Sequence, residues 1–75
     1  MDNLDDIKRV RNNLRRLAIE SGMTQEQIGV GMGFSKASAR QAVSRLLNPD
    51  LDYDPRLSTI ISFAKALNKR LEEVL

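Results

Sequence analysis

Apolar residues recur at intervals of three and four along most of this chain, a pattern typical of amphipathic helices. The first such stripe predicts a helix over residues 1–21. Its apolar members are Leu4, Ile7, Val10, Leu14, Leu17 and Ala18. Asn3 can cap this helix, and Asp5 and Asp6 suit its positive end. Gly22 suits the left-handed position that ends it.

The basic residues of this first segment lie mostly away from the apolar stripe. They are Lys8, Arg9, Arg11, Arg15 and Arg16. We interpret them as a soluble outer face whose aliphatic stems lie along the core, although some of them could also reach a phosphate group.

Two shorter helices joined by a tight turn are predicted over residues 24–47. Thr24 and Gln27 match a capping box, in which each side chain satisfies a backbone N–H of the other residue. Gly29 is a poor helix former, so we expect another helix to cross very close to it. Gly33 supplies the positive φ of the turn.

The second helix of this pair is expected to begin at Ser35 as its cap, after Phe34 as an apolar plug, and to end at Leu46 or Leu47. Its spacing gives an inward face of Ala39, Ala42, Val43 and Leu46. It also gives two outward rows, Lys36, Arg40 and Ser44 in one and Ala37, Gln41 and Arg45 in the other.

The outward rows carry side chains suited to reading base edges. Arg and Lys donate to guanine, Gln pairs with adenine, and Ala meets a thymine methyl group. Residues 31–47 include three basic residues and no acid, in a chain whose net charge is only +2. A local basic patch of this kind indicates directed binding to an anion, although three basic residues on a helix can also be only a solvated face.

Residues 48–56 form an acidic loop followed by two more helices. Asp50, Asp52 and Asp54 alternate as in a calcium loop, but the glycine and the final glutamate of such a loop are missing. Asp54 is instead expected to cap a fourth helix over 55–67, with Pro55 as its first residue. Tyr53 is expected to pack on the core.

The inner face of the fourth helix is predicted to hold Leu57, Ile60, Ile61, Phe63, Ala64 and Leu67. Asn68 is a plausible left-handed stop. The final residues, RLEEVL, predict a short fifth helix. The pattern therefore indicates one all-α domain over residues 1–75.

Composition excludes several classes of function. The chain has no Cys and no His, which removes thiolate chemistry and the commonest general base and metal ligand, so we expect neither an enzyme nor a cofactor or metal site. No apolar run reaches the length of a membrane span, and the acidic start is not a signal peptide, so a cytoplasmic protein is expected. The run GVGMG lacks the preceding strand and the Lys-Ser/Thr of a phosphate loop. Nothing in the pattern explains Gly31.

Residues 25–44, QEQIGVGMGFSKASARQAVS, resemble the helix-turn-helix of the phage-repressor and Cro class, the XRE family. The flanking segments SGMTQEQIG and ALNKRLEEVL are similar to the entry and the close of that family, so the resemblance covers residues 11–75. It implies a compact five-helix, lambda-repressor-like domain that binds operator DNA, usually as a homodimer. The sequence departs from the family at Ala42, Val43 and Arg45, and its 48–56 loop is longer and more acidic than usual.

The resemblance assigns roles to particular residues. It implies base contacts from Lys36, Ala37, Ser38, Arg40 and Gln41. Phosphate contacts are expected from Gln25, Ser44, Arg45, Asn48 and Arg56. The apolar terminal residues Leu71, Val74 and Leu75 are candidates for a dimer interface or for the core.

The leading hypothesis is a sequence-specific transcriptional regulator, in particular a repressor of a pseudo-palindromic operator. The alternative is an antitoxin or antirepressor whose main partner is another protein. An interaction surface would present apolar residues outward on the helix that begins near Ser35, whereas the sequence places polar and basic residues there.

Overall fold

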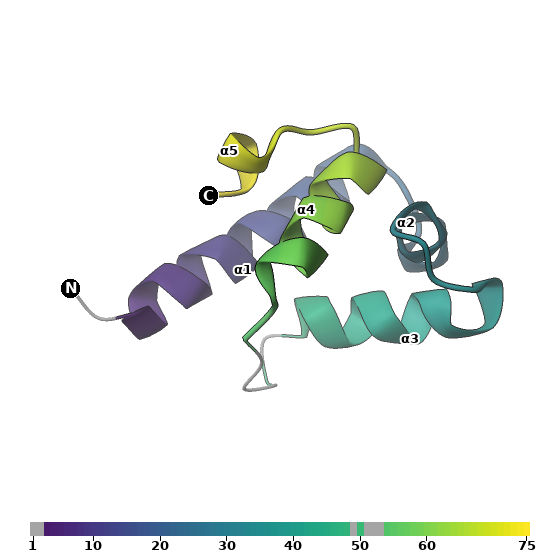
Figure 1. Ribbon diagram of the computed structural model, residues 1–75, viewed down its shortest axis with the longest axis horizontal. Coiled ribbons are helices and arrows are strands. Elements are labelled where there is room, and N and C mark those ends of the chain that lie inside the picture. Colours follow the sequence, from purple (N-terminus) through teal and green to yellow (C-terminus); the bar gives the residue numbers. More distant parts are fainter. Residues whose placement is uncertain (1–2, 49, 51–53) are drawn as a thin grey trace.

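The computed structural model describes residues 3–48, 50 and 54–75, and this part of the chain holds five helices and no strand (Figure 1). The all-α prediction is therefore confirmed. Asp52, which belongs to the calcium-like spacing, and Tyr53, which was expected to pack on the core, lie outside these residues. None of the helices described is long and apolar enough to cross a membrane.

The longest helix, α1, spans Asn3–Ser21. Three residues of the predicted apolar stripe are buried: Leu14, Leu17 and Ala18 are 0%, 5% and 9% exposed. Asn3 is already helical, so the prediction that it caps the helix from outside is wrong. The helix ends as expected, since Gly22 has a φ of 71°.

Helix α2 spans Gln25–Gly31, and its start is fixed by the predicted capping box. The backbone N–H of Gln27 donates to the Thr24 hydroxyl at 3.1 Å, and the N–H of Thr24 donates to the Gln27 side chain at 2.9 Å. Gly33 follows α2 with a φ of 104°, as predicted. The N–H of Phe34 then donates to the carbonyl of Gly29 at 3.0 Å, which closes the turn.

Helix α3 spans Lys36–Leu47 and packs closely on α2. A Cβ placed on Gly29 would lie only 2.6 Å from the Cβ of Ala39, so the predicted close crossing is confirmed. Ser35 occupies the N-cap position, but its side chain makes no capping bond and lies 2.9 Å from the Ser38 hydroxyl instead. Phe34 is 41% exposed, so the prediction that its ring fills the core is wrong. Its backbone N–H takes part in the turn, and its side chain stays at the surface.

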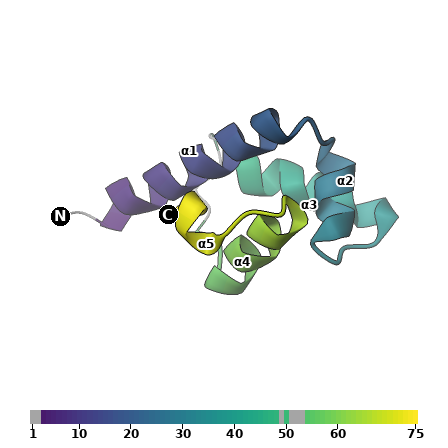
Figure 2. The same cartoon turned by 90° about the horizontal axis from the view of Figure 1, so that it is seen from above.

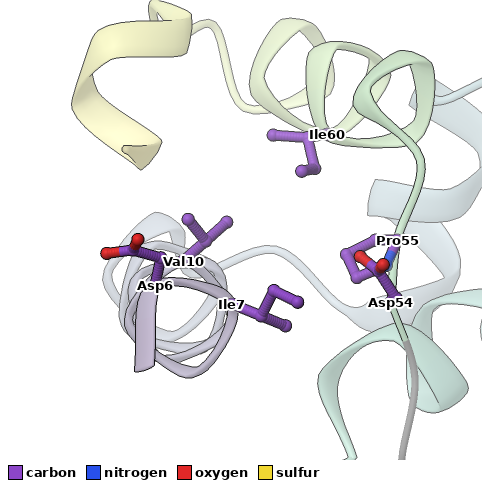
Figure 3. Close-up of a pocket in the computed structure, with 6 residues that line it drawn as sticks. All are labelled: Asp6, Ile7, Val10, Asp54, Pro55 and Ile60. Carbon is purple, nitrogen blue, oxygen red and sulfur yellow. The ribbon is translucent and has the colours of Figure 1, made fainter. Parts of the chain in front are cut away.

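Helix α4 spans Leu57–Ala66 and begins two residues later than predicted. Arg56 is its N-cap, so the assignments of Asp54 as the cap and Pro55 as the first helical residue are wrong. Pro55 is buried before the helix starts. Together with Ile7, Val10 and Ile60 it faces a small hollow of about 130 Å³ between this segment and α1 (Figure 3).

The inner face of α4 agrees with the prediction in part. Ile60, Phe63 and Ala64 are buried, Ile61 is half-buried, and the buried Leu67 is the C-cap that follows the helix. Leu57 is 58% exposed in the first turn, so its assignment to the inner face is wrong. Asn68 has a φ of 58° and ends the helix, as predicted.

Helix α5 spans Leu71–Val74 and lies beside α1 (Figure 2). The amide of Asn13 donates to the carbonyl of Val74 at 2.8 Å, which ties the two helices together. Val74 is completely buried. The core thus receives side chains from all five helices, with Phe63, Leu14, Ile28, Leu46, Val43 and Val74 as its largest fully buried members.

Candidate nucleic-acid interface

One face of α3 is uncovered. Figure 1 shows α3 along the lower edge of the molecule, with α1, α2 and α4 above it. Both predicted outward rows are exposed, as is Ser38: the exposed residues are Lys36, Ala37, Ser38, Arg40, Gln41, Ser44 and Arg45. On the other face Ala39, Val43, Leu46 and Leu47 are buried, and Ala42 is half-buried. The helix is thus amphipathic in the predicted sense.

The charge on this exposed face is entirely positive. Lys36, Arg40 and Arg45 are its ionised groups, and α3 contains no acidic residue. Among the residues described, neither Arg40 nor Arg45 has a carboxylate within ion-pair distance. Both guanidinium groups are therefore available to an anionic ligand.

Lys36 has a partner that the sequence pattern did not reveal. Its Nζ lies 4.0 Å from a carboxylate oxygen of Glu26 on α2, and the two side chains are 86% and 42% exposed. An exposed pair at this distance contributes little to stability. The lysine can therefore leave Glu26 for a stronger acceptor at small cost.

The residues expected to contact phosphate come from four places in the fold. Gln25 is the exposed first residue of α2, Ser44 and Arg45 are exposed on α3, and Arg56 is the exposed N-cap of α4. Asn48 is half-buried at the end of α3, and its side-chain oxygen accepts the N–H of Asp50 at 2.9 Å. Its side chain is thus already engaged in the turn.

A shallow hollow adjoins Arg45 between α3 and α4. It has a volume of about 230 Å³ and is lined by Met32, Phe34, Ala42, Arg45, Leu46 and Thr59. The half-exposed ring of Phe34 lies at this hollow and not in the core. No spacing rule in the sequence brings Thr59 and Arg45 to the same hollow, because their approach depends on how α4 is placed relative to α3.

Two arginines that we interpreted as an outer face instead reach the C-terminal end of α3. Arg11 donates to the carbonyl of Asn48, and Arg15 donates to the carbonyl of Leu47 at 3.1 Å. Arg11 is only 7% exposed, so the interpretation is wrong for this residue. The spacing in the sequence could have predicted this burial, because Arg11 lies four residues after Ile7 and three before Leu14, on the apolar stripe itself.

The predicted dimer residues separate into two kinds. Val74 is fully buried, and Leu71 is half-buried against the core, so both residues pack in or on the core of the chain. Leu75 is 52% exposed and is available to a partner. The short α5 therefore mainly covers the core.

The acidic loop contributes negative charge near the end of α3. Asp50 and Asp54 are both exposed. Phosphate would repel their carboxylates, so a duplex bound along α3 has to avoid them.

Comparison with known proteins gave no further constraint. A scan against protein-family models, a search of curated proteins and a search of solved structures each found no match for this chain.

Proposed function

We propose that this protein is a sequence-specific regulator that binds double-stranded DNA, with α2 and α3 acting as a helix-turn-helix. The observation that carries the proposal is the exposed face of α3, which holds three basic and several hydrogen-bonding side chains and no acid. Twelve residues of helix extend about 18 Å, and the major groove of about 12 Å width admits one helix.

Different residues carry the two parts of recognition. Lys36, Ala37, Ser38, Arg40 and Gln41 occupy the first half of α3 and read base edges in this proposal. Gln25, Ser44, Arg45 and Arg56 hold phosphates, which fixes the register of the protein on the duplex. Asn48 has a smaller role than the resemblance implies, because its side chain is engaged with Asp50.

The proposed assembly is a homodimer that represses transcription from a pseudo-palindromic operator in the cytoplasm. Two-fold symmetry places the half-sites about 34 Å apart, one helical turn of DNA. Leu75 is the one of the three suggested terminal residues that offers a largely exposed apolar surface for the contact. The symmetry and the repressor role rest on the resemblance to the phage-repressor class.

A matched pair of charge variants tests the proposal. Arg40→Gln with Arg45→Gln removes two charges from α3, and Arg9→Gln with Arg16→Gln removes two from the exposed side of α1. Fluorescence anisotropy with a duplex should show a large loss of affinity for the first variant and a small one for the second. Equal losses would show that binding depends on total charge and not on α3.

A protein partner is the second candidate function, and one surface favours it. Ile19 is 82% exposed beside a hollow of about 310 Å³. Ala18, Met23, Ile28 and Leu47 also line that hollow, so an apolar side chain of an antitoxin-type or antirepressor-type partner would fit there. A tight partner that co-purifies with the protein, together with no affinity for any duplex, would favour this function over DNA binding.

A further inference from the structure

Two side chains of α1 hold the C-terminal end of α3. The guanidinium of Arg15 donates to the carbonyl of Leu47, the last residue of α3, at 3.1 Å. The guanidinium of Arg11 donates to the carbonyl of Asn48, the C-cap. The two arginines are one helical turn apart on α1, so they reach adjacent carbonyls on the same helix end.

This contact supplies what a helix end lacks. The last four carbonyls of a helix have no donor within the helix, and they form the negative end of its dipole. A guanidinium meets both needs, since it donates several N–H groups and carries a positive charge. Arg11 is 7% exposed and Arg15 is half-buried, so these bonds are shielded from water more than a surface pair would be.

The opposite end of α3 is fixed in another way. Near its start, Ala39 packs against Gly29 of α2 with no room for an additional methyl group. Further along, Val43, Leu46 and Leu47 are buried against the core and already limit how far α3 can tilt. The bonds from Arg11 and Arg15, about two turns beyond Ala39, add two directed contacts at the far end and so refine the inclination of the helix.

We infer that Arg11 and Arg15 are positioning residues for DNA reading: they hold α3 at the angle at which its exposed face meets base edges. This inference rests on the proposed function. In this inference the pair acts through α3 and not through a contact of its own with DNA. Its effect should appear in the discrimination between a specific site and random duplex, since a tilted α3 loses base contacts while most phosphate contacts persist.

The adjacent residues Arg15 and Arg16 allow a matched test in the full chain. Arg15→Gln and Arg16→Gln remove the same charge, and each arginine also donates to an asparagine three residues earlier, Asn12 or Asn13. Arg16 is exposed, and its other partner is Glu20 of the same helix at 3.6 Å, so only Arg15 reaches α3. Each variant is titrated with a selected site and with a random duplex of equal length, below its unfolding temperature. Arg15→Gln should lower the ratio of specific to random affinity by up to about tenfold, because the positioning that it loses is worth at most one charge-assisted hydrogen bond. Arg16→Gln should leave that ratio unchanged.

Arg15→Lys provides the conservative variant, because it keeps the charge and one donor toward Leu47. It should fold and should restore part of the lost ratio. An unchanged ratio in Arg15→Gln, with only a lower unfolding temperature, would overturn the inference and leave the proposed function standing. If Arg15→Gln does not fold, Arg15→Lys takes its place, and its ratio should lie below that of the wild-type protein. A ratio equal to that of the wild-type protein would then overturn the inference. A wild-type protein with no sequence preference would overturn both the inference and the proposed function.

Discussion

Gly29 of α2 and Ala39 of α3 approach so closely that a Cβ on Gly29 would lie 2.6 Å from the Ala39 Cβ and 2.5 Å from the Ala39 carbonyl oxygen. Gly29→Ala should therefore force the two helices apart. The better helix propensity of alanine offers about 1 kcal/mol. Overpacking against a neighbouring backbone outweighs it, so we expect a net loss of about 1–3 kcal/mol in the free energy of unfolding, measured by urea denaturation.

Gly31 provides the matched control for that substitution. A Cβ there would lie 3.1 Å from the Cβ of Ala66 on α4, a tight contact that a shift of a few tenths of an ångström relieves. We expect Gly31→Ala to change the free energy of unfolding by less than about 1 kcal/mol, because propensity and crowding nearly cancel. If Gly31→Ala proved as costly as Gly29→Ala, the α2–α3 crossing would not be the special contact.

The two N-caps on either side of the turn give a second contrast. Thr24 accepts the N–H of Gln27, whereas Ser35 makes no capping bond to the backbone of α3. Thr24→Ala should cost about 1 kcal/mol, the usual value for a lost cap, and Ser35→Ala should cost clearly less. Thermal unfolding followed by circular dichroism compares the two. A larger loss at Ser35 would contradict the assignment of the caps.

The sequence allowed the helices and their inward faces to be predicted because local rules govern them. The Thr24–Gln27 box and the positive φ of Gly33 and Asn68 each depend on a few neighbouring residues. The close approach at Gly29 is a contact between two helices, but the poor helix propensity of glycine was enough to predict it. The division of α3 into a buried and an exposed face also followed from spacing alone.

Features that depend on distant parts of the chain were missed. Gly31 had no explanation until α4 was seen to bring Ala66 against it. The start of α4 was misplaced because the burial of Pro55 beside α1 overrides its preference for the first helical position. Arg11 was assigned to the surface because charge suggested exposure, whereas it is buried and donates to the carbonyl of Asn48.

Within the proposed interface, Arg40 should affect selectivity. Its side chain is exposed on the outward face of α3 and is suited to donating to a guanine. Arg40→Ala should weaken binding to a selected site by about 1–3 kcal/mol and relax the preference at one base pair. Competition with single-base variants of the site measures this. Unchanged affinity and unchanged preference would remove Arg40 from the set of base-reading residues.

Gln25 should behave differently, because its expected contact is with phosphate. Gln25→Ala should weaken binding to all duplexes alike, since the backbone carries no sequence information. Titrating the variant with the selected site and with unrelated duplexes distinguishes the two kinds of contact. A loss confined to one site would show that Gln25 reads a base.

The central claim is that α3 reads DNA sequence, and selection of bound duplexes from a random library tests it most directly. The selected sites should share a pseudo-palindromic consensus with half-sites about 34 Å apart. Affinity for the best site should fall steeply as salt rises, because bound phosphates release counterions. A library that emerges without enrichment, or binding that does not respond to salt, would contradict the account.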